Sequence, residues 1–390
     1  MKSSNEEFDV VIVGAGLGGL QCARLLGERG VRVLLLDRKR ALDVAVQTTG
    51  IFVLRTLEDF ALPEDCLGPP VRHVTLYSPA RRPLLLESPH DEFRVGRMQS
   101  LYLRCLAECQ RAGVEWLPHT RYAGCREAAQ SLSIVRLERD GRVCEVRARF
   151  VVGADGACSR VARDLGLDQN REWIVGVEEV LAGAPLAGPP RFHCFLDPRL
   201  APGYLAWIVN DGEETHLGVG GYATQFNPTA ALAEFRASVK DIVDLRAAKV
   251  IERRGGRIPV GGVLRRIANE RGLLVGDAAG AVSPLTAGGL DPCLRLSALA
   301  VRVIADYLAS SETSALAPYS GEFFRARFLS RLWMRRALKT LKSPTLLELA
   351  CAALRLPGFN QLAWQVFFGR GSFPDVEPSL VSPIVPVSTT

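Results

Sequence analysis

The chain has 390 residues, of which 48% are apolar and 23% are charged, and its formal net charge is +6. This length exceeds what one hydrophobic core usually supports, so we expect two closely packed domains, and the composition excludes a disordered chain. Only six of the 48 basic residues are Lys. The Arg residues are scattered through apolar segments instead of forming one basic cluster, which argues against a nucleic-acid-binding protein.

The ten Cys residues form no C-x-x-C pair and have no metal-ligand spacing with His, so we predict no metal site. Acidic residues stand near the N-terminus where a signal peptide would need an apolar run, and no run of eighteen apolar residues occurs. We therefore expect a cytoplasmic protein without a membrane-spanning segment.

The first elements of the chain have the pattern of a dinucleotide-binding unit. An apolar strand, Phe8–Val13, is followed by the glycine-rich turn Gly14-Ala15-Gly16-Leu17-Gly18-Gly19, which opens a helix with an apolar stripe. A second strand, Val31–Leu36, then ends at an acid, Asp37. Gly14 permits a tight turn, Gly16 lets the backbone approach a pyrophosphate, and Gly19 lets helix and strand pack closely. The helix N-terminus attracts phosphate, and Asp37 lies where a carboxylate accepts hydrogen bonds from ribose. The motif alone does not distinguish NAD from FAD.

Two later segments repeat a strand that runs into a turn with an acid. Phe150–Gly166 contains Asp155-Gly156, and Leu273–Ser297 contains Gly276-Asp277. With these three motifs the chain resembles the FAD-dependent oxidoreductases that include geranylgeranyl reductases, aromatic-ring hydroxylases and flavin halogenases. The resemblance covers roughly residues 8 to 370 and implies FAD as the cofactor.

The resemblance also implies which residues bind FAD. The glycine turn and its acid would bind the ADP half, the Asp-Gly segment would lie near the pyrophosphate, and the Gly-Asp segment would hold the ribityl chain. A loop beside the flavin ring, an Arg that opens a helix and the segment before another helix would also contact FAD. The full set of expected FAD-binding residues is Gly14, Ala15, Gly16, Gly18, Gly19, Asp37, Arg38, Thr49, Gly50, Arg97, Asp155, Gly156, Gly276, Asp277, Pro284, Gly288, Gly289 and Leu290. In that last helix we expect Asp291 to be the N-cap, with Pro292 in the first turn.

Between the FAD segments, short runs of Val, Ile, Leu and aromatic residues bounded by Pro and Gly predict an antiparallel sheet: Val71–Tyr77, Leu84–Ser88, Ile174–Leu181, Arg191–Leu196, Tyr204–Asn210 and Thr215–Tyr222. Segment 201–221 resembles the substrate-domain strands of geranylgeranyl reductases, so Tyr204 and Trp207 are candidate substrate-binding residues, although large aromatics in strands are core at least as often. Here Val209-Asn210 replaces the family's usual aromatic-Pro pair, and Thr286-Ala287-Gly288-Gly289 replaces Thr-Gly-Glu-Gly.

The predicted fold therefore combines α/β and α+β parts. A Rossmann-like FAD-binding domain of three-layer ββα type is assembled from residues 1–70, 91–168 and 263–312, a β-sheet substrate domain from 71–90 and 169–262, and a helical region with a tail from 313–390. The catalyst would be the flavin, because no catalytic side-chain triad is readable and the five His residues are scattered.

Three functions remain open at this stage. The favoured one is reduction of a carbon–carbon double bond in a small apolar, isoprenoid-like substrate; a class A monooxygenase that hydroxylates an aromatic or polyketide-like molecule and a flavin-binding redox module without turnover are the alternatives. A halogenase is disfavoured, because no Lys occurs from Ala41 to Val239 and that family needs one there. Only one dinucleotide fingerprint is present, so NAD(P)H or another reductant would act as a transient electron donor. The substrate's identity, the donor and the oligomeric state stay open.

Beyond Ser310 the pattern is helical. On a helical wheel, Arg331–Lys342 places Arg331, Arg335, Arg336, Lys339 and Lys342 on one side and Trp333, Met334, Ala337, Leu338 and Leu341 on the other. Two interpretations follow: the apolar side packs on the FAD domain, or it lies in a membrane interface as a peripheral contact.

Overall fold

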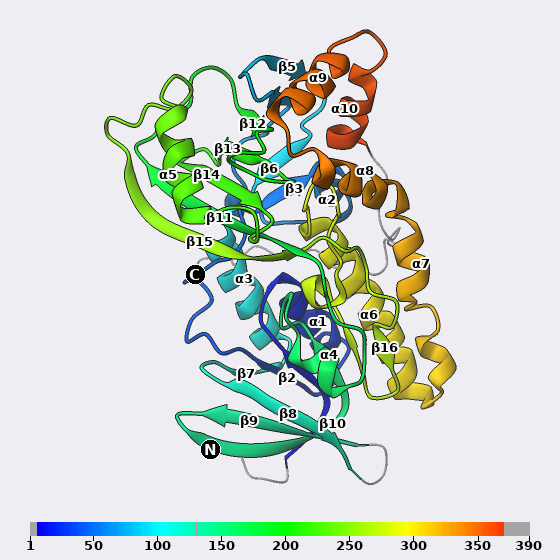
Figure 1. The fold of residues 1–390 in the computed structure, drawn as a ribbon. Coiled ribbons are helices and arrows are strands. Elements are labelled where there is room, and N and C mark those ends of the chain that lie inside the picture. The colour runs from blue at the N-terminus through cyan, green and yellow to red at the C-terminus, as the bar shows by residue number, and fades with distance from the viewer. Residues whose placement is uncertain (1–5, 129–131, 370–390) are drawn as a thin grey trace.

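The computed structural model describes residues 6–128 and 132–369, and two large sheets dominate this part of the chain. In Figure 1 the eight-stranded sheet with helices α1, α3 and α6 occupies one half of the molecule, and the seven-stranded sheet with α5 occupies the other. The C-terminal helices run along one side of both halves (Figure 1). The predicted combination of a Rossmann-like FAD domain, a substrate sheet and C-terminal helices is confirmed.

The eight-stranded sheet is built around parallel strands in the order β17-β10-β1-β2-β7, with β16 antiparallel to β17 at one edge. The long strand β10 extends beyond this core and pairs there with β9, which pairs with β8. The strands are β1 (Glu7–Val13), β2 (Val33–Leu36), β7 (Glu115–Leu117), β8 (Arg121–Glu127), β9 (Ser133–Arg139), β10 (Arg142–Gly153), β16 (Ala268–Asn269) and β17 (Gly272–Leu274). Central parallel strands are covered on both faces, so β2 is an unbroken run of buried apolar residues.

The seven-stranded sheet has the order β15-β11-β14-β13-β12-β4-β5. Its strands are β4 (His73–Tyr77), β5 (Pro83–Leu86), β11 (Trp173–Ala182), β12 (Arg191–Phe195), β13 (Ala206–Asn210), β14 (Glu214–Gly221) and β15 (Lys249–Pro259). All six predicted strands are present within a few residues. The purely antiparallel arrangement is wrong at one place, because β12 and β4 are parallel. The chain leaves this sheet after β5, builds much of the other sheet, and returns as β11; the next strand, β12, then lies beside β4.

The helices and the remaining elements complete the two halves. A small antiparallel pair joins β3 (Ile51–Val53) to β6 (Phe93–Val95). The helices of the FAD half and of the sheets are α1 (Leu17–Gly27), α2 (Leu54–Asp59), α3 (Met98–Arg111), α4 (Arg160–Asp164), α5 (Pro228–Ser238) and α6 (Leu290–Ser310), with short 3-10 turns at Glu64–Cys66, Gly276–Ala279 and Thr313–Leu316. The strands of each sheet fall inside the segments predicted for the two domains, while the domain boundaries themselves remain a prediction.

The C-terminal region is helical as far as the structure describes it. Its helices are α7 (Gly321–Ala326), α8 (Leu329–Thr340), α9 (Pro344–Leu354) and α10 (Asn360–Phe368). Ser343 caps α9 by accepting a hydrogen bond from the backbone N–H of Leu346, and Pro344 occupies the first turn. The predicted tail from Gly371 lies outside the described residues.

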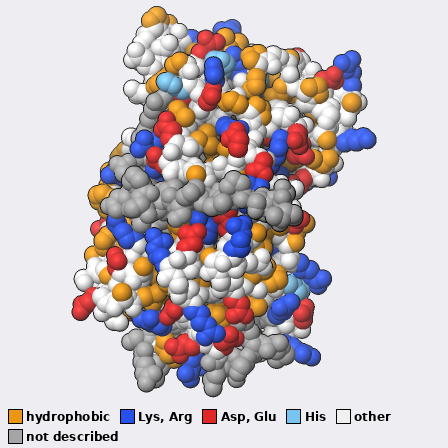
Figure 2. Space-filling model, turned by 180° about the vertical axis from the view of Figure 1, so that it is seen from behind, with side chains coloured by type: hydrophobic (Ala, Val, Ile, Leu, Met, Phe, Trp, Pro, Cys, Tyr) orange, Lys and Arg blue, Asp and Glu red, His pale blue; other side chains and the backbone are white. Residues whose placement is uncertain are grey.

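On the face of the molecule in Figure 2, basic and acidic side chains are interspersed among apolar ones. The described residues on this face form no continuous basic surface of the kind that nucleic-acid-binding proteins present.

Candidate active site

The glycine turn between β1 and α1 is packed so tightly that larger residues are excluded. Gly14 has φ +104°, and a Cβ atom added there would lie 2.2 Å from the carbonyl oxygen of Ala154. A Cβ on Gly19 would lie 1.9 Å from the carbonyl oxygen of Gly14. Gly16 is the N-cap of α1, has no side-chain cap, and faces open space. The free N–H groups of this helix start therefore border a cavity, in the arrangement that binds pyrophosphate.

Asp37 stands at the carboxyl end of β2 and closes one side of this turn. One carboxylate oxygen accepts a hydrogen bond from the backbone N–H of Ala15 at 2.8 Å, and the other accepts one from the N–H of Lys39 at 2.8 Å. These bonds orient the carboxylate at the cavity wall, where Arg38 also lies. A carboxylate held in this way is suited to accept hydrogen bonds from ribose hydroxyls.

The second acid, Asp155, follows β10 and organises the start of α4. Its Oδ2 accepts backbone hydrogen bonds from Arg160 at 2.7 Å and Val161 at 3.2 Å. Its Oδ1 is buried and has no hydrogen-bond partner among the described residues. Burial raises the pKa of this carboxyl. Gly156 beside it has φ +83°, so the chain turns back toward the cavity here.

The third acid, Asp277, lies in the 3-10 turn Gly276–Ala279 at the cavity wall. Within the described part of the chain its carboxylate accepts no hydrogen bond, and burial raises its pKa to about 6. A carboxylate without donors is costly to keep in a protein unless a ligand supplies them. The carboxylate of Asp277 therefore fits a ligand rich in hydroxyl groups, such as the ribityl chain of FAD, and Asp155 Oδ1 is a second acceptor without a partner among the described residues.

The segment before α6 forms the next part of the wall. Ala287 has φ +54°, and the Thr286 hydroxyl donates to Ser283 Oγ at 2.9 Å. Gly289 is the N-cap of α6 and has no side-chain cap, so N–H groups at this end remain available to a ligand. The predicted capping by Asp291 is wrong: Asp291 lies inside the helix and accepts hydrogen bonds from the Thr56 hydroxyl at 2.9 Å and Arg295 Nε at 2.8 Å.

These segments meet around one cavity of about 1140 Å³. It is lined by every predicted cofactor-binding or substrate-binding residue except Arg97 and Pro284, namely Gly14, Ala15, Gly16, Gly18, Gly19, Asp37, Arg38, Thr49, Gly50, Asp155, Gly156, Tyr204, Trp207, Gly276, Asp277, Gly288, Gly289 and Leu290. Arg97 does open α3, but its guanidinium pairs with Glu213 Oε1 at 2.6 Å instead of lining this cavity. The sequence around an Arg that opens a helix does not indicate a partner as far along the chain as Glu213.

At the substrate end, both predicted aromatic residues are buried and hydrogen-bonded. The Tyr204 hydroxyl donates to the carbonyl oxygen of Thr286 at 2.7 Å, and Trp207 Nε1 donates to Glu178 Oε2 at 2.9 Å. Tyr204 lies just before β13 instead of within it. Because the Tyr204 bond joins the substrate sheet to the segment before α6, the two halves of the molecule are tied together at the cavity.

An apolar arm of the cavity, formed by the C-terminal helices, was missed by the sequence analysis. Its lining comes from α8, α9, α10 and the residues beside them: Phe328, Met334, Ala337, Leu338, Leu341, Leu347, Ala350, Cys351, Leu354, Leu362, Ala363, Val366, Phe367 and Phe368. The available signal was the apolar spacing in these helices, which does not say whether the apolar side faces a core, a cavity or a membrane.

The wheel proposed for Arg331–Lys342 is right for most of its apolar side, because Met334, Ala337, Leu338 and Leu341 line the cavity, and wrong for three residues. Arg335 is 2% exposed, and its Nη1 donates to the carbonyl oxygen of Gly203 at 2.6 Å. Arg331 points to the cavity and donates to Ser283 Oγ at 3.0 Å, whereas Trp333 is 66% exposed. Two guanidinium groups therefore lie on the inner side. Each donates one hydrogen bond to an oxygen, and that of Arg335 also lies 5.3 Å from the ring centroid of Tyr204 and 5.4 Å from that of Tyr222.

Comparison with known proteins agrees with this site. The sequence profile of the FAD-binding-domain family matches residues 7–326. Digeranylgeranylglycerophospholipid reductase 1 of Methanopyrus kandleri is 33% identical over 317 residues, which are 79% of this chain and 83% of that protein.

Two solved structures share the fold. A geranylgeranyl bacteriochlorophyll reductase-like protein of Thermoplasma acidophilum superposes with a TM-score of 0.81 at 20% identity and covers 93% of this chain and 96% of its own. The p-nitrophenol 4-monooxygenase of Pseudomonas putida has a TM-score of 0.69 at 18% identity and covers 94% of this chain and 99% of its own. At these identities both likenesses establish the fold alone.

Proposed function

Because this chain belongs to the family of FAD-binding flavoproteins that contains the digeranylgeranylglycerophospholipid reductases, we propose that it reduces carbon–carbon double bonds of an isoprenoid chain. The observation that carries the proposal is the apolar arm of the cavity. The same cavity is lined by Tyr204 and Trp207 and by apolar residues of α8, α9 and α10. An apolar chain buried there gains roughly 0.8 kcal/mol for each CH₂ group removed from water.

The residues at the other end of the cavity fit FAD. The glycine turn and Asp37 would hold its ADP half, Asp155 would lie toward the pyrophosphate, and Asp277 would accept hydrogen bonds from the ribityl hydroxyls. Once reduced, FAD supplies the hydride for the double bond. The start of α6 offers free N–H groups and the positive end of a helix dipole, which favours negative charge nearby.

The apolar wall determines how a substrate can lie. An isoprenoid chain has no polar group to anchor its double bonds, so the position of the chain in the cavity depends on the shape of the cavity wall. Tyr204 and Trp207 are fixed by hydrogen bonds and present rigid rings to the cavity. The lining of the arm is mostly aliphatic and aromatic, so an apolar chain is favoured there over water.

A direct test uses the holoenzyme, photoreduced without oxygen and mixed with digeranylgeranylglycerophospholipid in detergent micelles. The flavin should return to its oxidised spectrum at a rate that rises with lipid concentration, and the lipid should gain two hydrogen atoms per reduced bond. A fully saturated lipid is the control and should leave the flavin reduced. Flavin that stays reduced with the unsaturated lipid would contradict the proposal. Oxygen incorporated into the product after admission of air would identify the monooxygenase alternative.

The electron donor is a separate part of the proposal. The chain contains one dinucleotide fingerprint, at Gly14–Gly19, so we propose that NAD(P)H or another reductant visits transiently. Anaerobic titration of the oxidised flavin with NADH and then with NADPH tests this. If NADH or NADPH bleaches the flavin absorbance, that nucleotide is the donor. If neither bleaches it, a protein reductant is the expected donor.

We further propose that the C-terminal helices touch a membrane surface peripherally. The support is a set of exposed apolar side chains on α8, α9, α10 and their connections: Leu329, Trp333, Leu346, Leu349, Leu356, Phe359, Leu362 and Trp364. Arg336, Lys339 and Lys342 are exposed on the same helices or beside them. Among the residues that the structure describes, no helix has the length and apolar character needed to cross a bilayer.

Flotation at low salt tests the membrane contact. The protein should float with phosphatidylglycerol vesicles and should float less with phosphatidylcholine vesicles, because the exposed cations attract anionic lipid. A double substitution, Trp333→Ser with Leu349→Ser, should remove most of the bound fraction. The matched control is Val143→Ser, which alters an exposed apolar residue on β10, away from these helices. Equal flotation of both variants would contradict the contact.

A further inference from the structure

Glu178 is a buried acid in the middle of β11, in the wall of the cavity. It is 3% exposed, and its side chain lines the cavity next to Trp207 and Arg254. Its neighbour Glu179 points to the opposite face of the strand, where it pairs with Arg236 at 3.0 Å and Arg253 at 3.1 Å. The sequence motifs do not include Glu178, and a charge at such a position requires an explanation.

Both oxygens of the Glu178 carboxylate are engaged. Oε2 accepts hydrogen bonds from the Thr49 hydroxyl and from Trp207 Nε1, the latter at 2.9 Å. Oε1 lies 3.1 Å from His216 Nδ1 and 3.5 Å from Arg254 Nη1. Arg254 Nη1 also donates to the carbonyl oxygen of Thr48 at 3.0 Å. One carboxylate thus joins the segment 48–50 to strands β13, β14 and β15.

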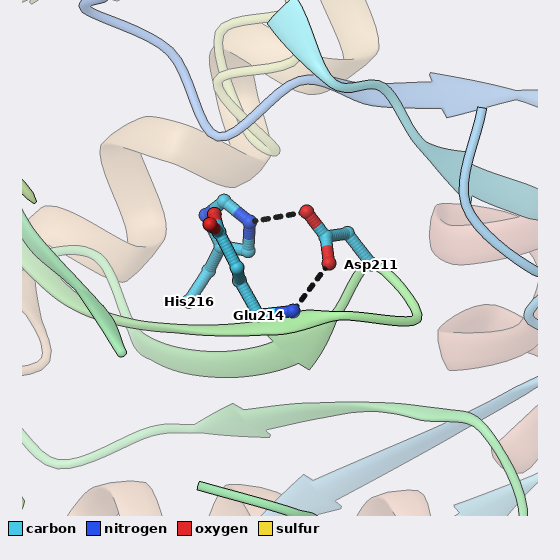
Figure 3. A group of neighbouring side chains, drawn as sticks. All are labelled: Asp211, Glu214 and His216. Carbon is cyan, nitrogen blue, oxygen red and sulfur yellow. Dashed lines mark hydrogen bonds and ion pairs between the residues drawn. The ribbon is translucent and has the colours of Figure 1, made fainter. Parts of the chain in front are cut away.

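His216 is held between two acids. Its Nε2 lies 3.4 Å from Asp211 Oδ2, and Figure 3 shows the Asp211 carboxylate turned toward the ring. Asp211 Oδ1 in turn accepts the backbone N–H groups of Glu213 at 2.9 Å and Glu214 at 2.6 Å. Since each ring nitrogen faces a carboxylate oxygen, the arrangement suits a protonated ring that donates twice. It does not suit a metal ligand, which needs a free nitrogen lone pair.

The charge state follows from these contacts. Burial by itself lowers the pKa of His216, but the Glu178 carboxylate and the hydrogen bond to Asp211 outweigh it and raise the pKa to about 9. Burial acts to raise the pKa of Glu178, and the His216 charge, its hydrogen bond, Thr49 and Arg254 together lower it. At neutral pH the pair is therefore a carboxylate and an imidazolium.

We propose that Glu178 is a positioning residue of this cavity, which holds the Thr48–Gly50 segment and Trp207 on one wall while His216 and Arg254 supply its counter-charge. An ionised carboxylate oxygen accepts from Thr49 and Trp207 at once, which a neutral acid or amide does less well. The proposal rests on the proposed function only in assigning Thr49 to the cofactor side and Trp207 to the substrate side. Loss of Glu178 would loosen both sides together.

The first test compares Glu178→Gln with Glu179→Gln, two isosteric changes at adjacent positions on opposite faces of β11. For Glu178→Gln we expect the Kd of the apoprotein for FAD to rise about tenfold, as for lost hydrogen bonds to a buried charge. Trp207 emission, assigned with Trp207→Phe, should shift in Glu178→Gln and stay unchanged in Glu179→Gln. Wild-type FAD affinity together with wild-type Trp207 emission in Glu178→Gln would overturn the proposal.

A second test measures the charge on His216 directly. In protein labelled with 15N-His, the His216 ring should stay protonated up to about pH 9. His193 is the internal control, because burial lowers its pKa to about 4 and its Nδ1 lies 3.1 Å from the Tyr77 hydroxyl, not from an acid. In Glu178→Gln the His216 titration should move to lower pH, and an unchanged titration would contradict the pairing. The groups that face His216 are Glu178, Asp211, Glu214 and Arg254.

If Glu178→Gln does not fold, Thr49→Val and Trp207→Phe remove the donors one at a time and leave the carboxylate in place. Thr49→Val should weaken FAD binding, and Trp207→Phe should raise the KM for the lipid while sparing FAD. The free energy of FAD binding, measured in both single variants and in the double variant, should show a loss in the double variant that differs from the sum of the single losses, because both donors share one oxygen. Additive losses would contradict a shared positioning group. FAD affinity and ring titration need no turnover, so they test Glu178 even if the wild-type protein fails to reduce the lipid.

Discussion

Asp277 is the residue at which we expect stability and the proposed FAD binding to oppose each other. Its carboxylate lines the cavity, lacks a hydrogen-bond donor among the described residues, and has a pKa of about 6 instead of the usual 3.8 because of burial. The folded state therefore binds its proton more tightly than the unfolded state does. Ionisation of Asp277 leaves the free energy of unfolding unchanged below about pH 4, lowers it progressively between about pH 4 and 6, and lowers it by the full amount above about pH 6.

Replacement of this acid gives the first prediction. Asp277→Asn should stabilise the FAD-free protein at pH 7 by about 3 kcal/mol at most and should leave its stability at pH 4 unchanged. The same change should weaken FAD binding about tenfold, because a carboxylate acceptor is lost. Denaturant unfolding of the apoprotein at both pH values and a flavin titration measure the two effects. A variant that binds FAD as tightly as the wild type would contradict the assignment of Asp277 to the ribityl chain.

At the scale of single residues, most of the residues that the motifs identified line one cavity, and their binding of FAD stays a prediction. The glycines of the first turn are recognisable because each is required by a local close contact, as for Gly14 and Ala154. Arg97 and Asp291 were misassigned because their partners, Glu213 and Thr56, are far away in the sequence. No local spacing identifies such a pair.

At the scale of elements, helices α8 to α10 have the largest influence on the substrate end. Neighbouring residues of α9 behave differently: Ala350 lines the apolar arm, whereas Leu349 is 62% exposed. Cys351 and Leu354 continue the inner side of the same helix. The helix thus offers a wall position and a surface position one residue apart, which makes a matched pair of substitutions available.

The second prediction uses this pair. Ala350→Trp should fill part of the arm, so the KM for a lipid with geranylgeranyl chains should rise about tenfold while a geranyl analogue is affected less. FAD content should not change, because α9 contributes no residue to the cofactor end. Leu349→Trp, at the exposed neighbouring position, should leave both KM values as in the wild type. Steady-state kinetics with the two substrates measures this, and equal effects of the two variants would contradict a chain-binding arm.

At the scale of the whole molecule, the cavity is the place where the two sheets and the C-terminal helices meet. The glycine turn and Asp37 come from the first sheet, Glu178 and Trp207 from strands of the second. Direct bonds across this boundary include Tyr204 to Thr286 and Thr49 to Glu178. A ligand that contacts both sides should therefore stabilise the fold as a unit.

Removal of FAD gives the third prediction. At a flavin concentration of about 100 times Kd, binding adds about 2.7 kcal/mol to the free energy of unfolding, which corresponds to a Tm increase of about 3 °C for a chain of this length. Thermal unfolding of the holoprotein and apoprotein at several FAD concentrations measures it. Asp277→Ala serves as the control and should show a much smaller increase at the same concentration. A Tm independent of FAD in the wild type would contradict binding in this cavity.

The amino-acid sequence by itself determined the FAD-binding fold and, through its resemblance to a family, the oxidoreductase class, because the glycines of short motifs are required by local backbone geometry. It also identified most residues of one end of the cavity. Six of the seven strands of the second sheet were predictable for another reason, because runs of Val, Ile, Leu and aromatic residues bounded by Pro and Gly are typical of strands. Only the tertiary structure decided that β12 lies parallel to β4, that Arg335 of α8 faces inward, and that Glu178 joins Thr49 to His216. Each of these depends on packing between distant segments, and a periodic pattern shows that a helix or strand has two sides without showing what covers either one.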